Sequence, residues 1–387
     1  MKQLVNLSRG ARWAVPAGAV VVVGGVLAGS MITVASAAPS LPQRTPAQLL
    51  AAVAGTTSTP PMSGTIVETS SLGLPSLPGT NSPTSLSSLL TGSHTIRLWY
   101  SDDTHFRVAV PQNMSETDLI RNGSNAWLWE STKNTVTHMA IPAAAASQNA
   151  KKASSAPPMT PQQAASQILA KVGPTTTVSS DTNVTVAGQA AYQLVLAPRS
   201  SQSLVGQIRI AIDGANNIPL RVQIFAKGAK TAAGQIGFTS ILFVKPTAAN
   251  FAFSPPAGAK VQQQSLGGGG KKPASASQAN SAYVVGKDWL SVADLPQSVL
   301  SSMTGSQTTP NSGSGLSGDT SSIISALLKS ATPVSGSWGK GRLVQTSLLS
   351  MLMTSNGRVL VGAVTPQVLY DAAGQPAPSP TSAAPAK

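Results

Sequence analysis

The chain has 387 residues, enough for one large domain or two ordinary ones, and it contains no cysteine. Without thiols, a disulfide framework, a thiolate metal site, a cysteine nucleophile and a lipid-modified N-terminal cysteine are all excluded. The formal charge of +14, from 26 basic and 12 acidic residues, favours an anionic partner such as nucleic acid, lipid headgroups or an anionic wall polymer.

Specific nucleic-acid recognition requires basic residues that cluster on one face beside aromatic or helical reading elements. Here the pairs Lys151-Lys152 and Lys271-Lys272 lie in stretches rich in Ala, Ser, Gly and Pro. We therefore expect a solvated basic surface and no specific nucleic-acid partner, while contact with a membrane surface stays open.

The N-terminus has the pattern of an export signal. Lys2, Arg9 and Arg12 precede an apolar run over about residues 13–34, and residues 35–37 (ASA) supply small side chains for cleavage before Ala38. Residues 1–37 are thus predicted to be a signal peptide. A run of this length also suits an uncleaved N-terminal anchor. Both readings predict an exported, extracytoplasmic protein, secreted or associated with the cell envelope.

The pattern after the signal predicts one helix followed by a meander of strands. Thr45-Pro46 places a threonine at the N-cap and a proline at the first helical position. Period-two alternation then predicts strands, and Asn122-Gly123 favours a hairpin turn. The predicted strands are residues 65–69, 93–100, 106–110, 118–121, 126–131 and 136–139.

The same logic repeats further along the chain. Thr160-Pro161 opens a second helix with apolar residues at helical spacing, and Gly173-Pro174 ends it. Strands are predicted at 192–196, 207–213, 220–224 and 236–243. Short strands joined by tight turns predict antiparallel pairing, because parallel strands need long crossovers.

Composition divides the chain further. Residues 40–262 are predicted to form the main domain, 263–281 a Gly/Lys/Ala/Ser linker, 282–373 a small C-terminal α+β extension and 374–387 a disordered Pro/Ala tail. Within the extension we expect a strand and turn over 283–293, a short helix over 323–328, and strands over 342–353 and 358–364 around Ser355-Asn356-Gly357. The predicted fold class is mainly β (α+β).

A sheet of this size is expected to curl into an open or closed barrel, which the two apolar helices could cover as a lid. Its concave face either encloses an apolar ligand cavity or is filled by its own side chains. From the alternation, the candidate cavity residues are Ile66, Ile96, Leu98, Val108, Leu194, Ile208, Ile210 and Val222. The candidate lid residues are Leu49, Leu50, Ile168 and Leu169.

Motifs for catalysis are absent from the sequence. His94, His105 and His138 lie in predicted strands, with no spacing that indicates a metal site. Residues 267–270 (GGGG) before Lys271 lack the spacing and the strand–helix context of a phosphate loop. We therefore predict no catalytic residues, no cofactor, no metal and no enzymatic activity.

A set of short segments carries a family resemblance. They are residues 63–69 (SGTIVET), 72–75 (LGLP), 89–95 (LLTGSHT), 118–123 (DLIRNG), 192–196 (YQLVL), 218–222 (IPLRV), 253–259 (FSPPAGA), 339–343 (GKGRL) and 357–364 (GRVLVGAV). In this order, over most of residues 40–370, they resemble the actinobacterial branch of the LolA-like family. The resemblance implies an unclosed antiparallel barrel with a helical lid over a hydrophobic cavity.

The best-known members of that family carry outer-membrane lipoproteins by their acyl chains, and a related member, RseB, senses lipid-type signals and regulates an anti-sigma factor. The resemblance therefore implies a carrier that binds lipid or lipoprotein acyl chains. The alternative is an RseB-like sensor that binds a membrane regulatory protein through the C-terminal extension. A third hypothesis is a structural envelope protein held by its basic surface, whose binding would be lost in salt.

Overall fold

A computed structural model describes residues 39–56, 58–71, 91–141, 160–170, 172–265, 283–296 and 331–376, all within one compact unit. The predicted signal peptide, both lysine pairs, the glycine run and the predicted helix over 323–328 lie outside these residues. So do almost all of the predicted linker and most of the predicted tail.

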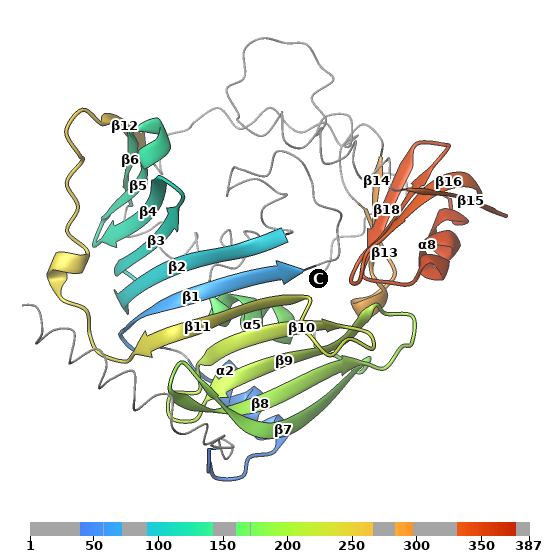
Figure 1. Ribbon diagram of the computed structural model, residues 1–387, viewed down its shortest axis with the longest axis horizontal. Coiled ribbons are helices and arrows are strands. Elements are labelled where there is room, and N and C mark those ends of the chain that lie inside the picture. The colour runs from blue at the N-terminus through green and yellow to red at the C-terminus, as the bar shows by residue number, and fades with distance from the viewer. Residues whose placement is uncertain are drawn as a thin grey trace, which may run out of the picture. The chain divides into compact units, whose positions relative to one another are not determined.

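The main element is an unclosed, twelve-stranded first sheet in the order β12-β6-β5-β4-β3-β2-β1-β11-β10-β9-β8-β7 (Figure 1). It consists of two meanders, β1–β6 and β7–β11, joined where β1 pairs with β11. This confirms the mainly β, unclosed architecture. The strands are β1 (Met62–Ser71), β2 (Thr91–Asp102), β3 (His105–Gln112), β4 (Ser115–Asn122), β5 (Asn125–Glu130), β6 (Thr135–Ala140), β7 (Thr176–Val186), β8 (Gln189–Pro198), β9 (Val205–Asp213), β10 (Pro219–Ala226), β11 (Gly234–Leu242) and β12 (Lys260–Ser265).

One edge of this sheet differs from the antiparallel expectation, because β12 pairs with β6 in parallel. The long connection after β11 allows this, since it carries the chain back before β12 begins. Along that connection Phe251 contacts the ring of His105, and Phe253 contacts that of Trp127 (Figure 1, yellow). The sheet is therefore mixed, and β12 runs past the predicted domain boundary at residue 262.

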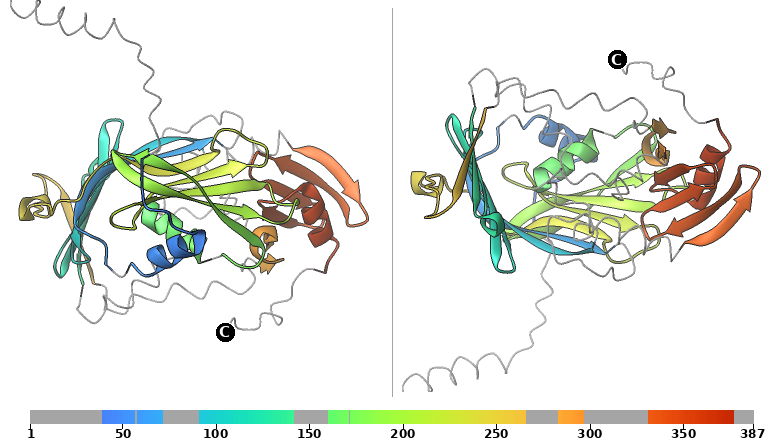
Figure 2. Two further views of the ribbon diagram at one scale, coloured as in Figure 1. Left: turned by 90° about the horizontal axis from the view of Figure 1, so that it is seen from below. Right: turned by 90° about the horizontal axis from the view of Figure 1, so that it is seen from above.

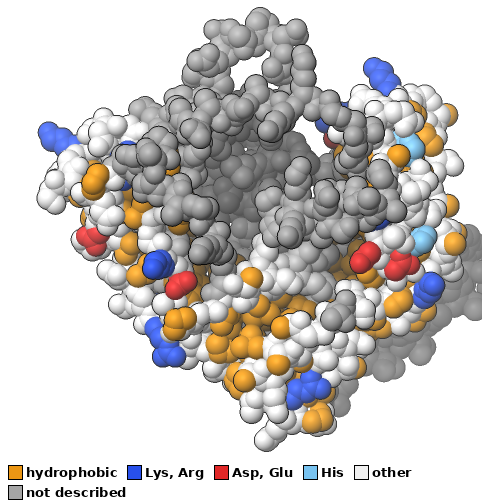
Figure 3. Space-filling model, turned by 180° about the vertical axis from the view of Figure 1, so that it is seen from behind, with side chains coloured by type: hydrophobic (Ala, Val, Ile, Leu, Met, Phe, Trp, Pro, Cys, Tyr) orange, Lys and Arg blue, Asp and Glu red, His pale blue; other side chains and the backbone are white. Residues whose placement is uncertain are grey.

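Two helices cover one side of the first sheet, as the Thr-Pro pairs predict. They are α2 (Pro46–Ala54) and α5 (Pro161–Leu169). In each, the N-cap threonine and the N3 glutamine bond reciprocally to the backbone in a capping box. The main contacts of α5 are with β10 and β11, and those of α2 are with β7. Figure 2 shows both helices on the same side of the β7–β11 strands, and Figure 3 shows hydrophobic side chains gathered on that side of the molecule.

The face of β3 and β4 opposite the side that the helices cover holds a partly buried ion pair. The guanidinium of Arg107 donates to the carboxylate of Asp118 and lies over the ring of Trp99, 5.6 Å from its centroid. Burial and the nearby Glu116 carboxyl raise the pKa of Asp118 to about 6, whereas Arg107 acts in the lowering direction. Both faces of this part of the sheet are thus covered, because Ile120 is also fully buried there.

A second, antiparallel sheet has six strands in the order β13-β14-β18-β17-β16-β15. The predicted single strand over 342–353 is wrong. A turn in which Thr346 accepts hydrogen bonds from the backbone N–H groups of Leu348 and Leu349 divides it into β16 and β17. The elements are β13 (Tyr283–Val285), β14 (Val292–Pro296), β15 (Thr332–Gly336), β16 (Gly339–Gln345), β17 (Ser350–Thr354), β18 (Arg358–Gly362) and the helix α8 (Pro366–Ala373).

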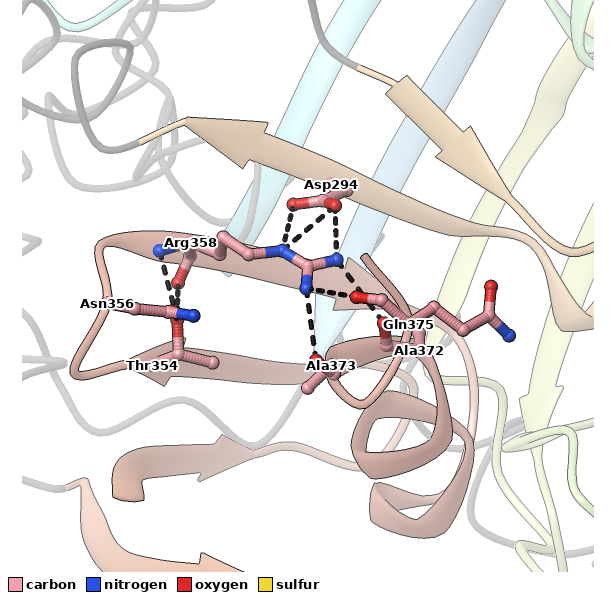
Figure 4. Close-up of polar contacts among 7 residues, drawn as sticks. All are labelled: Asp294, Thr354, Asn356, Arg358, Ala372, Ala373 and Gln375. Carbon is pink, nitrogen blue, oxygen red and sulfur yellow. Dashed lines mark hydrogen bonds and ion pairs between the residues drawn. The ribbon is translucent and has the colours of Figure 1, made fainter. Parts of the chain in front are cut away.

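Arg358 ties the second sheet to α8 (Figure 4). It is only 9% exposed, and its Nη2 donates to the Asp294 carboxylate on β14 at 2.7 Å. Its Nη1 donates to the carbonyls of Ala373 at 3.0 Å and Gln375 at 2.8 Å. One guanidinium therefore neutralises a buried carboxylate and also satisfies carbonyls at the C-terminal end of a helix, which intrahelical bonds leave unpaired.

Backbone bonds link the two sheets. The Leu204 N–H donates to Ala363 O at 2.9 Å, and the Thr365 N–H donates to Gln202 O at 2.8 Å. The indole N–H of Trp289 donates to Thr176 Oγ1 at 2.8 Å, and its ring packs against the core of the first sheet. The second sheet is therefore anchored to the β8–β9 connection and to β7.

Candidate ligand-binding face

Strand register aligns apolar side chains in rows across one face of the first sheet. This face, called the inner face below, carries Ile66, Leu98 and Ile210 and lies against α2 and α5. One row runs from Leu98 through Val108 and Leu119 to Leu128 on four neighbouring strands. Every second side chain of a strand points to the same face, and these four residues lie opposite one another on neighbouring strands. They therefore form one continuous row.

The structure brings all eight candidate cavity residues together. Each is buried, and all belong to one hydrophobic cluster on the inner face. Among the candidate lid residues, Leu49 is fully buried, whereas Leu50, Ile168 and Leu169 are half-buried and pack against that cluster. Their role in holding a ligand stays a prediction.

The inner face extends beyond the residues that alternation singled out. Five half-buried apolar side chains continue it over β3–β6: Phe106, Val110, Leu119, Leu128 and Met139. They lie outside the main contacts of the two helices. We call these five residues the open rim. Their signal in the sequence is the same alternation, but only the register shows that they continue the rows of Leu98 and Val108.

Two local features shape the inner face. At Gly64 a Cβ would clash with the backbone carbonyl of Ser240 and lie 3.0 Å from the ring of Phe238, so a glycine is needed where β11 approaches β1 this closely. Near the other end of β1, Glu68 pairs with His94 of β2. Burial raises the pKa of Glu68, while His94 acts in the lowering direction. The apolar rows therefore end at a titratable pair.

Apart from Glu68 and His94, the inner face offers mainly apolar burial. In the described ranges, no group of three or more His, Cys, Asp or Glu side chains is placed to hold a metal ion. No described helix is long and apolar enough to cross a membrane. Because its rows of side chains are apolar, the inner face is suited to an apolar ligand, whose binding would depend on the area removed from water.

No protein-family model and no curated protein sequence matches the chain. Among solved structures, the MucA/MucB complex of Pseudomonas aeruginosa aligns with 13% identity and a TM-score of 0.39, over 85% of this chain and 96% of that one. An uncharacterized conserved protein of Thermus thermophilus aligns with 14% identity and a TM-score of 0.30, over 56% of this chain and 98% of that one.

A LolA superfamily protein of Nitrosomonas europaea aligns with 7% identity and a TM-score of 0.21, over 55% of this chain and 99% of that one. The chain is therefore distantly similar in structure to MucB and to a LolA superfamily protein.

Proposed function

We propose that this protein is a non-enzymatic, extracytoplasmic carrier that binds a lipid or a lipoprotein acyl chain on its inner face. The observation that carries the proposal is the open rim, which continues the buried apolar rows onto strands outside the main helix contacts. Location outside the cytoplasm follows from the predicted export signal in residues 1–37.

Apolar burial supplies enough free energy for such a role. Each buried CH₂ contributes about 0.8 kcal/mol, so an alkyl chain that covers the open rim gains several times that amount. Half-buried side chains suit this better than fully packed ones, because a ligand can cover them without a cavity being opened in the core.

The carrier proposal predicts that Leu119→Gln and Leu128→Gln lower lipid binding about tenfold or more while the fold is kept, since each places a polar group on the row that contacts the ligand. The measurement is lipid extracted from purified full-length protein, with affinity for a fluorescent fatty acid in parallel. The matched control is Leu242→Gln, at a leucine that is 65% exposed on the opposite face. Absence of lipid from the wild type, or equal binding by all variants, would refute the carrier role.

The second candidate is a sensor that binds a membrane regulatory protein through the second sheet. It is favoured by the edge strand β13, where Val284 is 69% exposed, because open strand edges accept a further strand from a partner. Val284→Lys should then abolish capture of a membrane-anchored regulator from envelope extracts. Val244→Lys, at a residue that is 68% exposed after β11, is the control. Equal capture by both variants would exclude the edge as the contact.

A further inference from the structure

A polar basin of about 580 Å³ lies on the face opposite the inner face. Alternate residues of β8, β9 and β10 form it, because Gln193, Arg209 and Gln223 point away from the apolar rows of the same strands. Volumes of about 300–1,000 Å³ are typical of small-molecule sites. Its lining also includes Asp181, Gln207, Arg221, Phe225 and Lys230.

Arg209 is held in one orientation at the basin. Its Nη1 lies 3.5 Å from Asp181 Oδ2, and its guanidinium lies over the ring of Phe225, 5.1 Å from the centroid. With the Gln207 amide turned so that its oxygen faces the guanidinium, Nε and Nη2 also donate to Gln207 at 3.2 and 3.1 Å. The charge is therefore preorganised by three neighbours.

Arg221 differs from Arg209, because its guanidinium has no hydrogen bond or ion pair with any residue that the structure describes. Burial lowers the pKa of Arg221, and the charge of Arg209 adds to this. Its stem lies over Gly237 of β11, where a Cβ would be 2.8 Å from the Arg221 Cγ. Within the described part of the chain, this half-buried guanidinium thus lies beside a like charge and has no counterion.

The basin has an excess of positive charge. Arg209, Arg221 and Lys230 line it, and Asp181 is the one acidic residue among its described lining. Gln193 is only 5% exposed and donates to Asp181 Oδ2 at 3.4 Å. The basin therefore includes a buried polar side chain with a fixed hydrogen-bond partner. Hydrogen bonding from the Thr182 N–H lowers the pKa of Asp181, with Arg209 contributing, so its carboxylate stays ionised. The excess of basic side chains therefore favours an anionic ligand.

We propose that the basin binds a phosphate-type oxyanion between Arg209 and Arg221. Planar guanidinium groups match the geometry of such oxyanions, and charge-assisted bonds are about twice as strong as neutral ones. The phosphate could come from a phospholipid headgroup at a membrane surface or from a free phosphate compound. Because the basin and the inner face lie on opposite sides of the sheet, this site is independent of the proposed acyl-chain site.

The test uses the full chain and two probes. Inorganic phosphate is titrated by calorimetry, and vesicles of phosphatidylcholine with and without phosphatidylglycerol are used for flotation. Arg221→Gln should weaken phosphate binding about tenfold or more, since one charge-assisted bond is lost. Asp181→Asn should strengthen it, because a competing carboxylate is removed. Arg97→Gln, at an exposed arginine of β2 outside the basin, is the charge-matched control and should change little.

The two probes distinguish the source of the phosphate. Loss of both phosphate and phosphatidylglycerol-vesicle binding in Arg221→Gln identifies a headgroup site, whereas loss of phosphate binding alone identifies a site for a free phosphate compound. The proposal would be overturned if Arg97→Gln weakened phosphate binding as much as Arg221→Gln, or if neither variant changed it. The basin would then be an ordinary solvated basic surface. Vesicles of phosphatidylcholine alone are the control for insertion of the N-terminal apolar run into the membrane, which should be equal in all variants.

Discussion

Replacement of Arg358 by methionine is expected to destabilise the second sheet by about 3–5 kcal/mol, because it leaves the buried Asp294 carboxylate without its partner. The same change removes the donors to the carbonyls of Ala373 and Gln375 at the end of α8. Hydrogen exchange should therefore become faster in β14, β18 and α8 together, while the amides of β8–β10 keep most of their protection.

Two further variants separate the causes of this loss. Arg342→Met, at an exposed arginine of β16, should change the free energy of unfolding by no more than about 0.5 kcal/mol. The double variant Arg358→Met with Asp294→Leu should recover much of the stability, because no buried charge is then left unpaired. A loss below about 1 kcal/mol in Arg358→Met alone would contradict the importance of this network.

Ile210→Ala is expected to lower the free energy of unfolding by about 2–5 kcal/mol, the usual cost of a cavity in a packed core. Ile210 is fully buried among the inner-face residues of β8, β9 and β10. Leu119→Ala, on the half-buried open rim, should cost clearly less, since part of its side chain already contacts solvent. Urea unfolding of both variants at equal protein concentration gives the comparison.

The outcome of that comparison also locates the ligand site. If Ile210→Ala costs as little as Leu119→Ala, the inner face around Ile210 is not packed, and an acyl chain could enter there. If the cost is high, the open rim of β3–β6 is left as the place for the proposed acyl-chain site. Either result decides between a filled interior and an enclosed cavity, the two alternatives that alternation in the sequence left open.

Local chemistry explains which elements could be predicted. The Thr-Pro pairs and the Asn122-Gly123 turn act within a few residues, so both helices and the β4–β5 hairpin follow directly. Thr365-Pro366 carries the same signal and begins α8, a helix that was not predicted. Alternation indicates which residues share a face but says nothing about strand direction. The parallel pairing of β12 with β6 therefore could not be predicted from alternation.

The sites show the same division. The eight candidate cavity residues could be predicted because the alternation of apolar and polar residues within each strand indicates its buried side. The open rim and the polar basin could not, since both depend on which strands are neighbours. Arg209 and Arg221 come together with Asp181 only through the register of β7, β8, β9 and β10. No spacing within a single strand reveals such a cluster.

The pairing of β1 with β11 has a consequence for how the chain acquires its structure. Ser63 lies opposite Leu242, so the first strand has no partner on that side until the ribosome has made almost two thirds of the chain. Contacts of such high sequence separation slow folding and leave an exposed strand edge in the meantime. Each meander can assemble from neighbouring strands, whereas their union is a late event.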